Sequence, residues 1–234
     1  MVTALLLSGG SGKRMGLETP KQYIKVNGRP VIFYSLESLF AHEGIDAVEI
    51  VADEIWHETI LQCIAAVCAG NKNKFRGFST PGENRQLSIL NGLTDIRKYM
   101  TDTDYVLIHD AARPLLSARQ ITVCLEAAVG HDGVLPALPM KDTVYLSGDG
   151  KSVTALLDRK KIVAGQAPEV FMLGKYYEAN RALLPEKILD INGSTEPAVM
   201  AGMDIAMVSG DELNFKITTL ADLQRFEKIQ KDGK

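Results

Sequence analysis

The sequence has few of the features that mark secreted, membrane-bound or redox-active proteins. Among 234 residues there are three cysteines, Cys63, Cys68 and Cys124, which are too few and too odd in number for a disulfide framework. Cys63 and Cys68 fall in an apolar stretch with helical spacing, where buried thiols are more common than a redox pair. The first apolar run, 2–7, is far too short for a signal peptide or a membrane span. We therefore expect a soluble, cytoplasmic protein with no membrane partner.

The chain also has no large excess of charge of either sign. The net charge of -3 at pH 7 provides no general attraction to nucleic acid, so we expect no nucleic-acid partner, and any polyanion must be small and bound by local cations. The chain is 46% hydrophobic and 24% charged, as is usual for globular proteins. It contains no repeats, linkers or low-complexity segments. These observations predict a single domain over residues 1–234.

Short apolar runs alternate with amphipathic stretches along the chain. This alternation predicts an α/β fold, with a Rossmann-like, mainly parallel sheet flanked by helices. The predicted strands are 2–8, 46–52, 74–78 and 105–110. One helix is predicted to start at Pro30, and three more are predicted over about 54–69, 84–99 and 220–229. Polar residues follow the strand at 105–110, and ligands bind at such strand ends in parallel sheets.

The pattern changes from Gly133 onwards. Two apolar runs flank SGDG (147–150), and the pair Asp149-Gly150 is a strong signal for a hairpin turn. We predict a projecting two-stranded β-hairpin arm over 141–158, within the segment 139–160. A long hairpin with an apolar face is unstable alone in water, which indicates that the arm packs against something.

A glycine-rich segment, SGGSGKRM (8–15), follows the first predicted strand directly. The dinucleotide pattern G-x-G-x-x-G would require glycine at Met15. The P-loop pattern would require glycine at Leu7 and serine or threonine at Arg14. Both patterns therefore fail on register.

Three cations accompany this glycine segment: Lys13, Arg14 and, within PKQY (20–23), Lys21. Glycines after a strand allow backbone amides to approach phosphate oxygens. A surface turn with solvated charges would be the simpler interpretation of a single basic pair. Three cations around a glycine turn favour an anion site, and a nucleoside triphosphate is the natural anion.

Further motifs occur in order along nearly the whole chain. They are SGGSGKRM with PKQY, GENRQLSILNGL (82–93), HDAARP (109–114), PMKDT (139–143) and NFKITT (214–219). Together they resemble the cytidylyltransferases that act on polyol phosphates, namely methylerythritol phosphate cytidylyltransferase of isoprenoid synthesis and ribitol phosphate cytidylyltransferase. The resemblance implies a nucleotidyltransferase fold of the glycosyltransferase-A-like kind, and CTP and a small polyol phosphate as partners.

The resemblance also implies a reaction. The phosphate oxygen of the acceptor would attack the α-phosphorus of CTP in line, and pyrophosphate would leave. Catalysis of such a step is mostly positioning and electrostatic stabilisation by cations and Mg²⁺. Arg14 and Lys21 match the pair that holds the triphosphate, whereas Lys13 is peripheral. His109 is interpreted as structural, because an ionised phosphate needs no general base.

The resemblance assigns a nucleotide site as well. The residues matched are Ser8, Gly9, Gly10, Gly12, Gly82, Arg85, Ser88, Asp110 and Ala111. Asp110 would also lie near Mg²⁺, held mainly by the phosphates of CTP. For Arg85 and Ser88 the alternative is a helix N-terminal turn that satisfies its own amides. Arg113 would either serve the nucleotide or pin its own loop.

Three residues match the part of the family that holds the acceptor phosphate: Thr143, Arg159 and Lys216. Arg159 and Lys216 join Arg14 and Lys21 as the predicted catalytic residues. For Lys216 alone, a solvated strand lysine would be the ordinary interpretation. In the family the arm reaches across a two-fold dimer, so Thr143 and Arg159 would enter the partner's site, and we predict a homodimer through the arm 139–160.

Three places depart from the family pattern. The usual T-P-Q is replaced within Gln166-Ala167-Pro168-Glu169, where a carboxylate stands in place of an amide. The segment INGSTEPAVMAG (191–202) stands where an I-T-D-E-type helix start is usual, and the expected aspartate falls at Gly193. Lys160 and Lys161 add positive charge at the foot of the arm. A negative charge near a phosphate site disfavours a phosphorylated acceptor unless it is paired, so these departures bear on the acceptor.

The motifs leave several alternatives. PMKDT and the spacing from Arg14 to Lys21 favour the methylerythritol branch, whereas GQAP and NFKITT favour the ribitol branch, which stays as the alternative. A Rossmann oxidoreductase fails the glycine register and lacks a convincing ribose-binding carboxylate. A catalytically silent nucleotide-binding homologue is the alternative of a different class. Retention of the four catalytic candidates and Asp110 argues against it.

Overall fold

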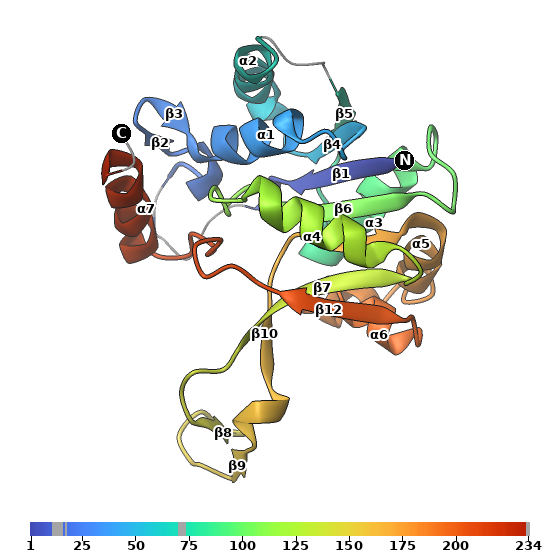
Figure 1. Cartoon of the computed structure of the whole chain (residues 1–234), viewed down its shortest axis with the longest axis vertical. Helices are drawn as coiled ribbons and strands as arrows, with labels where there is room; N and C mark the ends of the chain where they lie inside the picture. Colours follow the sequence, from blue (N-terminus) through green and yellow to red (C-terminus); the bar gives the residue numbers. More distant parts are fainter. Residues whose placement is uncertain (11–15, 17, 70–73, 233–234) are drawn as a thin grey trace.

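The centre of the protein is one mainly parallel sheet (Figure 1). The structure is a computed structural model that describes residues 1–10, 16, 18–69 and 74–232. The strand order is β10-β7-β11-β6-β1-β4-β5, and β12 pairs with β7. The strands are β1 (Val2–Leu7), β4 (Ala47–Val51), β5 (Phe75–Ser79), β6 (Tyr105–Asp110), β7 (Gly133–Pro139), β10 (Val163–Gly165), β11 (Glu169–Met172) and β12 (Ile205–Ser209). Only β10 and β11 run against their neighbours. The predicted α/β class is confirmed.

The central strands end together at one edge of the sheet. β1 lies between β4 and β6 and is parallel to both. Leu7, the last residue of β1, is in register with Val51 of β4 and with Asp110 of β6. The carboxyl ends of these parallel strands therefore lie side by side. The loops that follow them, together with nearby helix starts, form the site at this edge.

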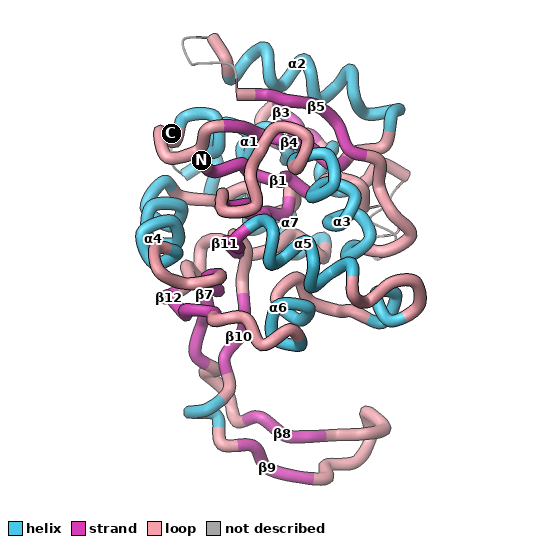
Figure 2. The backbone as a smooth tube through the Cα atoms, turned by 90° about the vertical axis from the view of Figure 1, so that its right-hand side faces the viewer, coloured by secondary structure: helices cyan, strands magenta, loops and turns pink. Residues whose placement is uncertain are grey.

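Helices cover both faces of the sheet (Figures 1 and 2). The helices are α1 (Val31–Ala41), α2 (His57–Val67), α3 (Arg85–Ile96), α4 (Ala118–Ala128), α5 (Leu173–Arg181), α6 (Glu196–Met200) and α7 (Leu220–Asp232). Side chains of α1, α2 and α4 pack on one face, and side chains of α3, α5 and α6 pack on the other. Gly92 allows α3 to approach β1 closely, because a Cβ there would lie 2.5 Å from the Leu5 side chain.

The predicted helix starts agree with local chemistry. Pro30 precedes α1 directly, as its fixed φ allows. Asn84 caps α3, and its side chain accepts a hydrogen bond from the Leu87 amide at 2.8 Å. The stretch predicted as one helix from residue 54 instead begins as a 3₁₀ turn, Glu54–Trp56, before α2. No helix in the described part of the chain is both long and apolar enough to cross a membrane.

A two-stranded arm extends away from the body (Figure 1). It contains β8 (Val144–Leu146) and β9 (Ala155–Leu157), which pair antiparallel, and it ends in the 3₁₀ turn Arg159–Lys161. The prediction of an arm is confirmed, but the connection is the longer loop 147–154 and not a two-residue turn. The Asp149 carboxylate accepts hydrogen bonds from the amides of Lys151 and Ser152, which orders this loop without a tight turn.

Short elements surround the site and complete the fold. A second small sheet pairs β2 (Lys25–Val26) with β3 (Arg29–Pro30), directly after the 3₁₀ turn η2 (Lys21–Tyr23). Another 3₁₀ turn, η5 (Lys187–Asp190), lies against the start of α3, where the Asn84 side chain donates to the carbonyl of Ile188. These contacts fix two of the segments that carry predicted site residues.

Candidate active site

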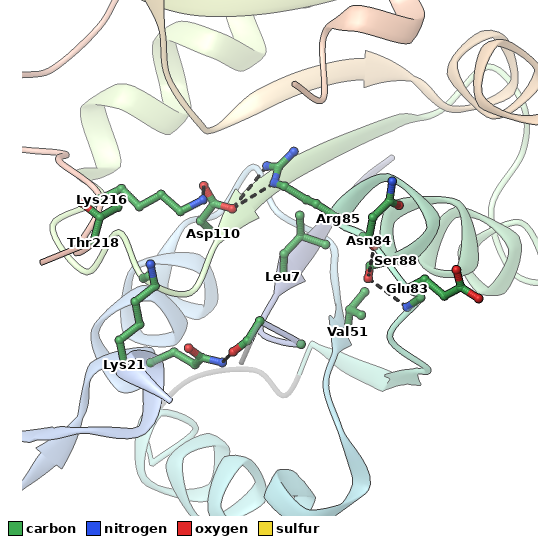
Figure 3. Close-up of a pocket in the computed structure, with 15 residues that line it drawn as sticks. Leu7, Lys21, Val51, Glu83, Asn84, Arg85, Ser88, Asp110, Lys216 and Thr218 are labelled. Carbon is green, nitrogen blue, oxygen red and sulfur yellow. Dashed lines mark hydrogen bonds and ion pairs between the residues drawn. The ribbon is translucent and has the colours of Figure 1, made fainter. Parts of the chain in front are cut away.

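A pocket of about 420 Å³ opens at the carboxyl edge of the sheet (Figure 3). Its walls come from the ends of β1, β4 and β6, from the turn that begins α3, and from the segments that carry Lys21 and Lys216. Figure 3 shows Lys21 and Lys216 entering from the side opposite α3. The pocket therefore lies where a parallel sheet is expected to bind its ligand.

Asp110 is the charged centre of this pocket. Its Oδ1 atom lies 3.3 Å from Nη2 of Arg85, and its Oδ2 atom lies 3.0 Å from Nζ of Lys216 and 3.4 Å from Nε of Arg113. Burial alone would raise the pKa of Asp110, but the three cations hold that pKa well below its usual range. The carboxylate is thus ionised at neutral pH. Three cations around one carboxylate leave a net positive charge, which suits a polyphosphate.

Lys216 is held in place by anchors on both sides of it. The buried Asn214 donates its side-chain amide to the carbonyl of Ala167 at 2.7 Å. The Ile217 amide donates to the carbonyl of Ala112 at 2.8 Å. Arg113 also donates to the carbonyl of Asn214, so it holds this segment, and not only its own loop, beside Asp110. Lys216 is therefore positioned toward the carboxylate and is not a solvated strand lysine.

The turn before α3 forms another wall of the pocket. Ser88 Oγ accepts a hydrogen bond from the Gly82 amide and donates one to the Asn84 carbonyl, both at 2.9 Å. A Cβ at Gly82 would lie 2.4 Å from the Leu87 side chain, so only glycine fits there. The Ser88 hydroxyl thus satisfies the turn itself, as the alternative interpretation expected. The turn nevertheless lines the pocket and presents its backbone there.

Residues of the PKQY motif form hydrogen bonds to the start of the glycine loop. The buried Gln22 side chain donates to the carbonyls of Ser8 and Gly10, each at 2.7 Å. The Tyr23 hydroxyl lies 2.8 Å from Ser8 Oγ, and its ring stacks on Trp56 with centroids 4.0 Å apart. Gln22 was not among the predicted site residues, although the motif contains it. Its two carbonyl acceptors could not be inferred without the structure.

We predict that Gln22→Ala weakens both the fold and nucleotide binding. The substitution leaves two carbonyls of the glycine loop without a donor, which should lower the free energy of unfolding by about 2 kcal/mol. Binding of a nucleoside triphosphate should weaken because the loop loses its fixed position. Thermal unfolding and nucleotide titration test this, with Gln62→Ala, an exposed glutamine of α2, as the control. Equal behaviour of the two variants would contradict the prediction.

His109 behaves as a structural residue. It is fully buried, and its Nε2 lies 3.0 Å from the carbonyl of Arg113, to which it donates. Burial lowers the pKa of His109 to about 4. The ring is neutral at physiological pH, and it holds the turn that carries Arg113.

The structure brings most of the predicted site residues together. Those that line the pocket are Gly9, Gly10, Lys21, Gly82, Arg85, Ser88, Asp110 and Lys216. Arg14 and Gly12 lie outside the described residues. Ser8 and Ala111 lie behind the pocket wall, where the Ala111 amide donates to the carbonyl of Leu7, and Ala112 takes the lining position.

Thr143 and Arg159 do not join the pocket of their own chain. Both are exposed, and they lie next to β8 and in the 3₁₀ turn at the end of the arm. The Arg159 guanidinium donates to the carbonyl of Lys141 at 2.7 Å, at the foot of the arm. An acceptor clamp built from these residues would therefore need another copy of the chain.

The donor set around Asp110 constrains any metal. Among the described residues, no cluster of three or more histidine, cysteine, aspartate or glutamate side chains could hold a metal ion. Both oxygens of Asp110 already accept from cations. A Mg²⁺ ion in this pocket would therefore take its ligands mainly from substrate phosphates, and the pocket offers the carboxylates of Asp110 and Glu83 beside them.

Solved structures share the fold of this chain. The structure resembles that of 4-diphosphocytidyl-2C-methyl-D-erythritol synthase from Anaerococcus prevotii, with a TM-score of 0.81, 22% identity, and coverage of 98% of this chain and 96% of that chain. This likeness shows that the two chains have the same α/β fold over nearly their whole lengths.

The family model for IspD, 2-C-methyl-D-erythritol 4-phosphate cytidylyltransferase, matches residues 2–232, and the chain belongs to this family. The enzyme of this name from Lachnospira eligens is 34% identical over 228 residues, which cover 96% of each chain. A ribitol-5-phosphate cytidylyltransferase from Streptococcus agalactiae is 28% identical over 230 residues, which cover 98% of this chain and 95% of the other. The predicted family is confirmed.

Proposed function

We propose that this enzyme transfers CMP from CTP to a polyol phosphate, with 2-C-methyl-D-erythritol 4-phosphate as the first candidate, and releases pyrophosphate. The observation that carries the proposal is the convergence of Arg85, Lys216 and Arg113 on Asp110, with Lys21 in the same pocket, at the carboxyl edge of the sheet. Membership of the family and the 34% identical relative support the choice of reaction.

The proposed chemistry requires only positioning and charge from the protein. The acceptor phosphate oxygen forms a bond to the α-phosphorus, and the bond from that phosphorus to the bridging oxygen breaks, which releases pyrophosphate. Lys21 and Lys216 reach into the pocket where negative charge would increase during this step. Fixed cations at such a place lower the barrier because they need no reorganisation. No protein base takes part, and the neutral His109 is occupied with a backbone carbonyl.

We further propose Mg²⁺ as the cofactor, bound by the phosphates of CTP with Asp110 as its protein ligand. When bound, the ion neutralises charge on the triphosphate. The residues nearby would then hold the nucleotide and orient its α-phosphate. The cytoplasmic localisation and the absence of a nucleic-acid partner stay predictions from the composition.

The experiment that tests the function is pyrophosphate release from CTP and Mg²⁺, with methylerythritol phosphate and ribitol phosphate supplied separately. Release with methylerythritol phosphate is the expected result, and UTP and ATP serve as nucleotide controls. Release only with ribitol phosphate would favour the alternative function, a ribitol phosphate cytidylyltransferase, which the relative from Streptococcus agalactiae supports. Binding of CTP without release from either acceptor would favour the catalytically silent homologue.

We propose a homodimer in which each arm completes the partner's site. Apolar side chains of the arm are exposed in the single chain, with exposed fractions of 56% for Tyr145, 68% for Val153 and 67% for Leu156. Thr143 and Arg159, at the two ends of the arm, are not among the residues that line the pocket of their own chain. A hairpin of this kind gains stability when its apolar face is covered.

We predict that Leu156→Glu converts the dimer to a monomer, which still binds CTP but has lost turnover. The added charge would have to be buried in the interface, whereas the pocket itself is unchanged. Analytical ultracentrifugation and the pyrophosphate assay test this. The control is Val129→Glu, which changes a valine that is 77% exposed outside the arm.

A mixing experiment adds a test of the shared site. Lys21→Ala and Arg159→Ala should each be inactive alone. A mixed dimer contains one site with both native residues, so equal mixing after subunit exchange should restore about a quarter of the wild-type turnover. Absence of restored turnover, with mixed dimers demonstrated, would contradict a site shared between subunits.

A further inference from the structure

Glu169 places a second buried carboxylate behind the pocket. It is the first residue of β11 and pairs with Ile108 of the antiparallel neighbour β6. Side chains alternate along a strand, so Glu169 lies on the same face of the sheet as Ile108 and Asp110. That face is covered by α3 and α5, and Glu169 is only 7% exposed. The glutamate that departs from the family pattern is thus next to the charged centre of the site.

The partner of Glu169 comes from the second segment that departs from the pattern. Ser194 Oγ donates a hydrogen bond to Oε1 of Glu169. Among the described residues, none donates to Oε2, which is buried. The carbonyl of Ser194 accepts from the Tyr176 hydroxyl at 2.6 Å, and that hydroxyl accepts from the side chain of Gln86 at 3.1 Å. Buried polar side chains therefore connect Glu169 to the first turn of α3.

Several charged and titratable groups are near enough to Glu169 to influence its ionisation. Arg85 faces it from α3, Asp110 from the end of β6 and Arg113 from the following turn. Tyr176 of α5 packs on the same face of the sheet as Ile108, whereas Cys124 of α4 packs on the opposite face. Burial raises the pKa of Glu169, while Arg85 and then Ser194 favour the ionised form. The Arg85 guanidinium is hydrogen-bonded to Asp110, and its charge also favours the ionised form of Glu169 behind the pocket.

On the basis of the proposed function, we propose that Glu169 is a positioning residue that shares Arg85 with Asp110 and that, when ionised, weakens the binding of CTP and pyrophosphate. Its charge offsets part of the attraction that Arg85 and Arg113 exert on a polyphosphate. An anion that binds too tightly leaves slowly, so a buried carboxylate behind the cations favours release of pyrophosphate. Ser194 holds the carboxylate in the orientation that faces Arg85.

The first test compares wild type with Glu169→Gln, which keeps the shape of the side chain and removes its charge. Isothermal titration with CTP and with pyrophosphate, at pH 8 without acceptor, measures binding alone. We expect both Kd values to fall by about tenfold, as loss of one nearby charge in a partly buried site allows. The control Glu178→Gln removes an exposed carboxylate of α5 and should change neither Kd. An unchanged or higher Kd in Glu169→Gln would overturn the proposal.

The pH dependence separates a charge effect from a merely structural one. Because the pKa of Glu169 is raised, the carboxyl ionises above the usual glutamate value of about 4.3. As the pH rises through that pKa, wild type should lose affinity relative to Glu169→Gln, and the ratio of the two Kd values should level off when ionisation is complete. The titration of CTP itself cancels in the ratio. A ratio independent of pH would contradict the proposal.

A second variant covers the case in which Glu169→Gln does not fold. Ser194→Ala keeps the carboxylate but removes the hydrogen bond that favours its ionised form. The fall in affinity should then occur at higher pH than in wild type, and an unmoved profile would overturn the proposal. Failure of the wild type to bind CTP at all would instead refute the proposed function.

Discussion

Replacing Lys21 with alanine is expected to lower kcat for CMP transfer by about 100- to 1000-fold, while CTP still binds. Lys21 lines the pocket, and its backbone is fixed because the next two residues, Gln22 and Tyr23, are bonded to the start of the glycine loop. A cation held this firmly stabilises charge that develops during the reaction. Such a group should therefore affect kcat more than the KM for CTP.

The control for this prediction is Lys25→Ala, which removes an exposed lysine of β2 only a few residues away. Steady-state kinetics with CTP and the active acceptor give both parameters. A kcat for Lys21→Ala within a few-fold of wild type would show that this lysine does not act on the reacting phosphate. The family match assigns the same role to Arg14, which lies outside the described residues, so Arg14→Ala is expected to behave in the same way.

Asp110→Asn is expected to abolish measurable turnover and to lower the free energy of unfolding by about 3 kcal/mol at neutral pH. The substitution leaves Arg85, Arg113 and Lys216 close together without the carboxylate that they share. Mutual repulsion would displace these side chains from their present positions. Urea unfolding and the pyrophosphate assay measure the two effects.

The pH dependence of this stability has a definite sign. The folded-state pKa of Asp110 is depressed, so its contribution to stability is complete above the pKa of an unfolded aspartate, about 3.9, and is lost as the pH falls toward the lower folded-state value. The difference in unfolding free energy between wild type and Asp110→Asn should be constant above about pH 5 and shrink below about pH 4. A difference that grows on acidification would contradict this assignment.

A surface ion pair provides the matched control. Asp102 pairs with Arg97 at 2.9 Å, but its side chain is 60% exposed. Asp102→Asn should therefore change the free energy of unfolding by less than about 1 kcal/mol. A similar loss in both variants would mean that the cations around Asp110 contribute no more than an ordinary exposed pair.

The central strands and the helices beside them could be predicted from the sequence. The runs that became β1, β4 and β6 are apolar on both faces, as in any strand buried between two layers of helices, and Asn84 and Pro30 marked helix starts by their backbone chemistry. Apart from the arm and the C-terminal helix α7, the elements after residue 115 were not predicted. α5 carries few apolar residues, and β12 is only partly buried, so neither shows a clear apolar pattern. α4 does have an apolar face, which the sequence analysis missed.

For the site too, the sequence indicates individual residues but not the contacts between residues that are distant in the chain. Motifs identified Lys21, Arg85, Asp110 and Lys216 one by one, because each motif is a short stretch of chain. Nothing in those stretches states that the Lys216 ammonium would bind Asp110, since the two are far apart in the sequence. The contact between Glu169 and Ser194, which joins the two departures from the family pattern, was likewise not predictable, because it depends on α5 packing beside β11.

The sequence by itself determined the family, the α/β class, the arm and most of the residues of the site, because local patterns and motifs carry that information. The tertiary structure decided which of these residues meet. It gathered three cations on Asp110, placed Glu169 behind Arg85, assigned Gln22 to the glycine loop, and left Thr143 and Arg159 outside the lining of their own pocket. The physical reason is that charge, burial and hydrogen bonding act through space, and the register of the sheet decides which distant residues become neighbours.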